Sequence, residues 1–266
     1  MNNPSAEQSA EQKAQVQAYF SRTAASYVTS TSHRTGSDLQ RLIELGEFSS
    51  QQYAIDIATG GGHTALAVAP RVGQIMVTDL TPTMLEQAQA YILAQGITNA
   101  EFQIADAEAL PFADNTFDRA TCRIAPHHFP NIAQAVREVA RILKPNGLFL
   151  LIDNMAPANP ALDAFINKVE KWRDPSHGRS CTEQEWHSFF TQAGLQVEHS
   201  ETSRHIYQYD DWTARSQMPD DEKARLEQFI LTSDEQTKRY FIITQKADGH
   251  LESISSDKLL LIGRKQ

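Results

Sequence analysis

The amino-acid sequence predicts an α/β protein built around a doubly wound, mostly parallel sheet. From about residue 50 to residue 155, short apolar runs alternate with segments of helical periodicity. This alternation is typical of a parallel sheet covered by helices on both faces. The first apolar run, 54–58, breaks abruptly into Thr59-Gly60-Gly61-Gly62, and an apolar-periodic segment follows at once. A strand that turns through bare glycines into a helix lets a nucleotide-like ligand approach the backbone.

Apolar runs and their flanking signals give the element boundaries in this region. Thr81 before Pro82 predicts a helix start, with Thr81 as N-cap and the proline in the first turn. Asn131 is expected to cap the helix that contains Val136 and Val139. Strands are expected near 53–58, 74–79, 101–105, 118–123 and 147–153, and helices over 63–70, 82–95 and 131–142.

The segments on either side follow a different pattern. Residues 1–10 are polar and predict a disordered start, whereas the spacing of Val16 and Phe20 predicts a helix, and a second helix is expected over 38–45. The hydroxyl-rich connector 24–33 could fold over a pocket. After residue 155 we expect helices over 161–171, 183–193, 220–229 and 234–240, and strands over 196–208, 241–244 and 258–263.

The composition argues against several classes of protein. With 41% hydrophobic and 21% charged residues, the 266-residue chain is typical of a soluble globular protein. Its net charge of −9, with no basic cluster, argues against a nucleic-acid substrate. No apolar stretch approaches the roughly 20 residues that span a bilayer, and the polar N-terminus lacks a signal-peptide core. Cys122 and Cys181 form no C-x-x-C pair, so we expect no disulfide framework and a cytoplasmic protein; a homodimer is left open.

Two carboxylates near the glycine loop suggest what the loop binds. Gly60-x-Gly62-x-x-Ala65 fits the dinucleotide fingerprint G-x-G-x-x-A, a match with little weight alone. Asp56 lies inside the expected strand, where a buried carboxylate needs hydrogen-bond partners. Asp79 ends the next apolar run, where an acid can accept two hydrogen bonds from a ribose diol. Each feature also has a structural explanation, a tight turn for the glycines and a loop or helix cap for the acids.

Five motifs follow one another between about residue 50 and residue 155. The glycine loop and Asp79 are the first two; next come Asp106-Ala107 after the third expected strand, the run Ala109–Asp118 before the fourth, and the turn Leu143–Gly147 into the fifth. In this order they resemble the class I S-adenosylmethionine (SAM)-dependent methyltransferases, near the branch of the ubiquinone/menaquinone C-methyltransferases. The family's first motif has a glycine where this chain has Ala58, a mild departure.

The resemblance implies a fold, a domain organisation and a cofactor. The fold would be a seven-stranded Rossmann-like sheet whose last strand runs antiparallel between strands five and six. An N-terminal helical cover would occupy 1–47 and the methyltransferase domain 48–266, with a helical insertion at 209–248. SAM would be the cofactor, with Asp56 organising the first loop, Asp79 binding the ribose and Asp106 the adenine amine. The cofactor-binding residues implied in this way are Asp56, Ala58, Thr59, Gly60, Gly62, Asp79, Leu80, Met84, Asp106, Ala107 and Arg123.

The loop after the fourth strand, Arg123–Phe129, contains the candidate catalytic residues His127 and His128. Strand carboxyl ends line the ligand crevice in such folds, so a histidine here could take a proton from a carbon or oxygen acid. The paired histidines could equally be structural and cap the next helix; if one is catalytic, we favour His127. No second ligand pair stands at a suitable spacing, so we expect no metal site.

Three further features could shape an acceptor site. The polar turn Arg173–Arg179 could gate or orient the acceptor, or be a solvated loop. Tyr27 and His33 could cover the sulfonium side of the cofactor. Aromatic residues of the C-terminal third could form core or line an apolar pocket: Trp172, Trp186, Phe189, Phe190, Tyr207, Tyr209 and Trp212.

The function predicted from these features is methyl transfer from SAM to a small, partly apolar acceptor molecule. Holding the acceptor in line with the methyl group can supply ~7–11 kcal/mol at best, and a base is needed only if the acceptor must lose a proton. The alternatives are a nicotinamide-dependent oxidoreductase, a non-catalytic SAM-binding regulatory module, and a relative that keeps SAM but catalyses another reaction, such as a rearrangement. The oxidoreductase leaves Asp106-Ala107 and the turn into the fifth strand unexplained.

Overall fold

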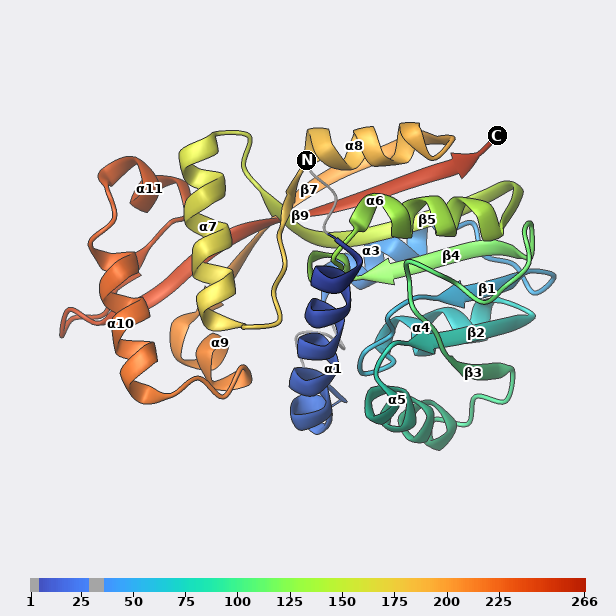
Figure 1. Ribbon diagram of the computed structural model, residues 1–266, viewed down its shortest axis with the longest axis horizontal. Helices are drawn as coiled ribbons and strands as arrows, with labels where there is room; N and C mark the ends of the chain where they lie inside the picture. The colour runs from blue at the N-terminus through green and yellow to red at the C-terminus, as the bar shows by residue number, and fades with distance from the viewer. Residues whose placement is uncertain (1–4, 29–35) are drawn as a thin grey trace.

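The central sheet organises the whole molecule (Figure 1). The protein is seen as a computed structural model that describes residues 5–28 and 36–266, with the backbone alone for 24–28. The strands are β1 (Tyr53–Asp56), β2 (Gln74–Asp79), β3 (Ala100–Ile104), β4 (Phe117–Arg123), β5 (Leu143–Ala156), β6 (Cys181–Thr182), β7 (Leu195–Gln208), β8 (Thr244–Gln245) and β9 (Leu251–Lys265).

The strand order is β3-β2-β1-β4-β5-β9-β7. The first five of these strands are parallel, and β9 runs antiparallel between β5 and β7. The expected α/β architecture with an antiparallel last strand is therefore confirmed. The short strands β6 and β8 pair with β5 and β9 and extend the sheet to nine strands within the described ranges.

Helices cover both faces of this sheet. The helices of the described residues are α1 (Ala6–Val28), α3 (Ser37–Leu45), α4 (His63–Val68), the 3-10 turn η1 (Ala69–Arg71), α5 (Pro82–Ala94), the 3-10 turn η2 (Pro126–His128), α6 (Ile132–Ile142), α7 (Pro160–Arg173), α8 (Glu183–Gln192), α9 (Tyr209–Arg215), α10 (Asp220–Leu231) and α11 (Glu235–Tyr240). In the part of the chain that the structure describes, no helix combines the length and the apolar character needed to cross a membrane.

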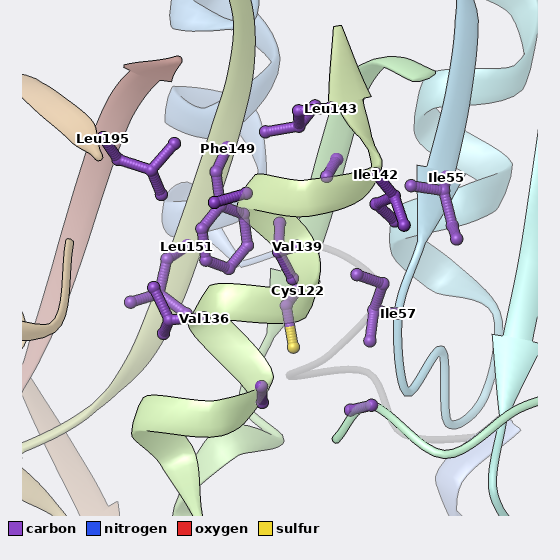
Figure 2. Packing of buried hydrophobic residues seen from close by; sticks show 14 of the residues in the cluster. Ile55, Ile57, Cys122, Val136, Val139, Ile142, Leu143, Phe149, Leu151 and Leu195 are labelled. Carbon is purple, nitrogen blue, oxygen red and sulfur yellow. The ribbon is translucent and has the colours of Figure 1, made fainter. Parts of the chain in front are cut away.

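The side chains of β5 point alternately to the two faces of the sheet, and each set packs against a different helical layer. Successive residues of a strand point to opposite faces. Leu150 and Ile152 pack in a cluster with Leu42 of α3, whereas Phe149 and Leu151 belong to the larger cluster that includes side chains of α6 (Figure 2). Both faces of β5 are thus buried, which accounts for its continuous apolar run.

A second apolar cluster joins the C-terminal helices to the far ends of β7 and β9. It contains Val169 of α7, Trp212 of α9, Leu226 of α10, Phe241 and Leu251. Figure 1 shows these helices on one side of α1 and the parallel strands on the other. The chain therefore forms two lobes that share the long strands β7 and β9.

The expected disordered start is wrong in part, because α1 begins at Ala6. Ser5 and Gln8 form a reciprocal cap in which the Gln8 N–H donates to Ser5 Oγ over 3.2 Å and the Ser5 N–H donates to Gln8 Oε1 over 2.9 Å. At its other end α1 runs through Val28, into the segment expected to be a connector.

The strand expected at 241–244 is also wrong, apart from its last residue, which belongs to β8. The Phe241 N–H donates to the Thr237 carbonyl over 3.0 Å and so extends the end of α11. Ile242 then adopts a left-handed φ of 46°, which turns the chain before β8.

Of the two predicted helix caps, the one at Asn131 is confirmed. Its side-chain oxygen accepts the Gln134 N–H over 3.0 Å at the start of α6. Thr81 occupies the N-cap position of α5, but its side chain makes no capping hydrogen bond. Its backbone N–H donates instead to Asp79 over 2.8 Å, which ties the helix start to the end of β2.

Candidate functional site

A cavity opens at the carboxyl ends of the parallel strands, between the two lobes. One wall consists of the loops after β1, β2, β3 and β4, and the other of residues from α7, β7, α9 and β9. Lys13, Val16 and Phe20 of α1 close a third side. Of the predicted cofactor-binding and catalytic residues, those that line the cavity are Ala58, Thr59, Gly60, Asp79, Leu80, Met84, Asp106, Ala107, Arg123, His127 and His128. Asp56 and Gly62 do not belong to the lining.

The loop after β1 has a left-handed backbone at three positions. Ala58, Gly60 and Gly62 have φ angles of 53°, 55° and 82°. Glycine adopts this region freely, whereas an alanine is strained there. A Cβ at Gly60 would lie 3.7 Å from Met84 Cε, an ordinary contact, but one at Gly62 would lie 3.1 Å from Ile92 Cδ1. Gly62 is therefore favoured by its left-handed backbone and by its packing against α5.

Asp79 connects two of the loops that line the cavity. Its Oδ2 accepts the Gly60 N–H over 3.0 Å and its Oδ1 accepts the Thr81 N–H over 2.8 Å. Burial raises the pKa of this carboxyl group, and the two backbone donors oppose part of the rise. Each carboxylate oxygen has a further lone pair that could accept a hydrogen bond from a hydroxyl group of a molecule bound in the cavity.

Asp56 lies behind the loop rather than in the cavity. Its two oxygens accept the hydroxyl groups of Thr59 and Thr121, each over 2.6 Å. Burial raises its pKa to about 6, although these hydrogen bonds favour the charged form. Asp56 therefore holds Thr59 in place next to Gly60.

Asp106 is tied to helix α1 by an ion pair. Lys13 Nζ lies 2.7 Å from Asp106 Oδ2 and 2.7 Å from Glu108 Oε2. Further along α1, Gln17 Nε2 donates to the Leu80 carbonyl over 2.9 Å. These contacts hold α1 across the loops that follow β2 and β3, so it covers this end of the cavity.

Arg123 ends β4 and pairs with a carboxylate from α3. Its Nε and Nη2 lie 3.1 and 2.9 Å from the two oxygens of Asp38, a bidentate arrangement. The next residue, Ile124, has a φ of 54°, which is rare for a β-branched side chain. The chain is therefore strained where it enters the loop that holds the two histidines.

His127 has a buried carboxylate partner that the sequence analysis missed. His127 Nδ1 lies 2.6 Å from Oδ1 of Asp153, near the end of β5. Burial alone would lower the pKa of His127, but the Asp153 carboxylate outweighs it and the pKa is raised. A charged residue directly after the apolar run Leu148–Ile152 was the signal that could have identified Asp153.

His128 differs from its neighbour, although the two rings lie only 4.1 Å apart. His128 Nδ1 lies 3.1 Å from the Ser176 carbonyl oxygen. Burial and the neighbouring His127 lower the pKa of His128 to about 3, so it stays neutral. Of the two histidines, His127 has the partner and the pKa that suit proton transfer.

The opposite wall contains most of the residues that sequence reasoning missed. Tyr207 and Trp212 of the aromatic set line the cavity, whereas Trp186 and Phe190 lie in the main core. The side chain of Tyr27 and all of His33 lie outside the described residues. Arg173 and Asp174, from the polar turn singled out in the sequence, also line this wall. The residues of the wall that the sequence did not indicate are Asn154, Glu170, His205, Arg215 and Lys258.

Comparison with known proteins places the chain among methyltransferases. Residues 55–151 match the family model described as a methyltransferase domain. The chain is 36% identical over 247 residues to YcgJ of Bacillus subtilis, an uncharacterised methyltransferase, covering 93% of this chain and 98% of that protein. The solved YcgJ structure superposes with a TM-score of 0.85 over 87% of this chain and 99% of its own. The ubiquinone/menaquinone C-methyltransferase UbiE of Pseudomonas putida is 35% identical over 131 residues, covering 46% of this chain and 51% of that protein.

Proposed function

The chain belongs to the class I SAM-dependent methyltransferases, and we propose that it transfers the methyl group of SAM to a small, partly apolar acceptor. The observation that supports this most directly is the convergence of Gly60, Asp79 and Asp106 on one cavity whose lining also includes His127. When bound, SAM supplies an electrophilic methyl group on a sulfonium. The residues of the chain bind it, orient the acceptor and remove a proton where the acceptor has one to lose.

The cofactor end of the cavity would be formed by the loops after β1, β2 and β3. Asp79 would accept hydrogen bonds from the two ribose hydroxyl groups, and Asp106 would accept one from the adenine amine. Leu80 and Met84, which also line the cavity, would pack beside them. The backbone of the Ala58–Gly60 loop would hold the methionine end, and Asp56 would keep this loop in shape through Thr59. Arg123 and Ala107 complete the proposed set.

The acceptor end would use His127 as general base. The Asp153 carboxylate accepts a hydrogen bond from Nδ1–H of His127, so Nε2 is the ring nitrogen that could take a proton from an oxygen or carbon acid. His127 Nε2 would take the proton of the acceptor while the acceptor takes up the methyl group that bound SAM would supply. His128 would be structural, because its lowered pKa of about 3 makes it a weak base and its Nδ1 lies at the Ser176 carbonyl oxygen.

We also propose a division of labour between the segments of the chain. The N-terminal segment, residues 1–47, would act as a cover, because Lys13 and Phe20 line the cavity from α1. The segment at 209–248 would shape the acceptor site, because Trp212 and Arg215 reach the cavity from α9. Residues 48–266 would form the methyltransferase domain that contains this insertion.

Isothermal titration with SAM, S-adenosylhomocysteine and NAD tests the proposed cofactor. We expect SAM and S-adenosylhomocysteine to bind and NAD not to bind. Binding of NAD without SAM would instead support an oxidoreductase. SAM binding without turnover on a broad panel of small acceptors would favour a regulatory role.

A further inference from the structure

One wall of the cavity has three cationic side chains next to the carboxylates of Glu170 and Asp174, in a chain whose net charge is −9. Lys258 of β9, Arg215 of α9 and Arg173 of α7 all line the cavity there. Arg173 is already neutralised, since its Nε and Nη2 lie 3.1 and 2.9 Å from Glu170 Oε2. In the described part of the chain Lys258 has no carboxylate at so short a distance, so it is the cation of this wall that a bound molecule could engage, and Arg215 also lines the cavity there.

Lys258 is the most informative of these residues because it is buried and poorly paired. The residue is only 8% exposed, and burial lowers the pKa of its ammonium group. Within the described residues its ion pair is with Asp38, whose Oδ2 lies 3.6 Å from Nζ. That carboxylate already accepts two hydrogen bonds from Arg123. A buried ammonium that shares one distant counter-ion is costly, and an anion in the cavity would offset this cost.

The strands place other polar groups beside Lys258. Asn154 of β5 lies directly opposite it in the ladder, and Ser256, two residues earlier on β9, pairs with His205 of β7. Side chains at such positions share one face of a sheet. Asn154 Oδ1 is buried with no hydrogen-bond partner in the described ranges. Burial, together with the charges of Lys258 and Arg215, lowers the pKa of His205 to about 4, so His205 is a neutral hydrogen-bonding group.

A flat apolar surface adjoins this polar cluster. Tyr207 follows His205 on the same face of β7, and its ring stacks on Trp212 with centroids 5.1 Å apart. Both rings line the cavity. Aromatic faces of this kind favour a planar or unsaturated body over a highly hydrated one.

We propose that the acceptor is an anionic molecule with a flat apolar body, whose carboxylate or phosphate group binds Lys258 and Arg215 while its body packs on Tyr207 and Trp212. This inference rests on the proposed function, because it names the class of acceptor for the same cavity. The anionic group anchors the acceptor at one end, which leaves the atom to be methylated free to approach His127.

Binding of three small probes to the full-length protein saturated with S-adenosylhomocysteine tests the inference. Benzoate and phenyl phosphate represent the two anionic groups, and benzamide is a neutral molecule of the shape of benzoate. We expect one of the two anions to bind at least about tenfold more tightly than benzamide, the scale of a hydrogen bond to a charged group. The anion that binds more tightly identifies the group as carboxylate or phosphate.

Lys258→Met should weaken binding of the preferred anion about tenfold and leave the affinity for benzamide unchanged. Lys238→Met is the matched control, because Lys238 lies on α11 and pairs with Glu235 on the exposed surface. If Lys258→Met does not fold, Arg215→Gln tests the same wall, and the comparison of the three probes on the unmodified protein stands by itself.

Equal affinity for benzamide and both anions would overturn the inference. So would an equal loss of S-adenosylhomocysteine affinity in Lys258→Met, because Lys258 would then serve the carboxylate of the cofactor. A failure of the unmodified protein to bind S-adenosylhomocysteine would reject the proposed function, and this assignment of the acceptor with it.

Discussion

His127 and Asp153 form a buried hydrogen-bonded pair, with Nδ1 2.6 Å from Oδ1. The histidine comes from the turn after β4 and the aspartate from the adjacent strand β5, so the sheet itself sets their separation. The other oxygen of Asp153 has no hydrogen-bond partner among the described residues. Asp153 therefore orients the imidazole through one oxygen and holds the proton on Nδ1.

Replacing Asp153 by Asn tests this pairing. An amide can donate to Nδ1, which would move the ring proton to Nε2 and remove the base. We expect turnover to fall by a factor of about 10²–10⁴, the usual share of general acid–base catalysis. The affinity for S-adenosylhomocysteine, measured by calorimetry, should stay within about twofold, because Asp153 lies outside the proposed cofactor set. Unchanged turnover would show that Asp153 has only a structural role.

His127→Gln and His128→Gln form a matched pair of variants. The first should slow turnover by about 10²–10⁴ with little effect on SAM affinity, because it removes the proposed base. The second should mainly lower the free energy of unfolding, by about 1 kcal/mol, since it loses the hydrogen bond to Ser176. Single-turnover rates and urea unfolding of both proteins separate the two effects. If His128→Gln slowed turnover more than His127→Gln, His128 would be the base and His127 the structural residue.

The pH dependence of turnover should report the raised pKa of His127. A base must be neutral to accept a proton, so kcat/KM should rise with pH through a pKa above 6.5, the ordinary histidine value. Asp153→Asn should move any remaining acid limb to lower pH, because the neighbouring negative charge is lost. An acid limb below 6.5 in the unmodified protein would argue against this base. The profile is measured with saturating SAM.

Asp79→Ala should weaken SAM binding by roughly 1.5–3 kcal/mol, the scale of hydrogen bonds to a charged group. The variant also frees the N–H groups of Gly60 and Thr81 that the carboxylate accepts. Glu101→Ala is a suitable control, because Glu101 lies near the amino end of β3, away from the cavity. Equal SAM affinity in Asp79→Ala and the unmodified protein would remove Asp79 from the cofactor site.

Asp38 should contribute stability that depends on pH. Burial opposes its charged form, but Arg123 and Lys258 outweigh burial and hold its pKa at about 2. Because the folded pKa lies below the ordinary 3.8, the contribution is complete above 3.8 and is lost as the pH falls through about 2. At pH 7 Asp38→Asn should therefore cost about 2 kcal/mol in the free energy of unfolding.

Urea unfolding at pH 7 and at pH 3 measures this contribution. The difference between Asp38→Asn and the unmodified protein should shrink at the lower pH. Asp114→Asn is the control: its side chain is 68% exposed and pairs with Arg141, so its loss should cost at most about 0.5 kcal/mol. A difference for Asp38→Asn that is the same at both pH values would contradict the assigned pKa.

The sequence alone was sufficient for the parallel half of the molecule and for most of the proposed cofactor end. Periodicity and turn residues are local signals, and in a parallel sheet the residues after each strand meet at one edge. Asp79 and Asp106 could therefore be placed together without any knowledge of side-chain contacts. At Phe241 the apolar run predicted a strand, but the side chain is buried in the core of the C-terminal lobe and the residue follows helix α11 instead.

Tertiary structure decided which side chains become partners. His127 and Asp153 are 26 residues apart, and Lys13 and Asp106 are 93 residues apart. Such pairs depend on strand register and on how α1 and the C-terminal lobe pack, and neither is encoded in a short stretch of chain. Lys258 shows the limit most clearly: in the sequence it opens an apolar strand, and only the fold brings it to a cavity with Arg215, His205 and Tyr207.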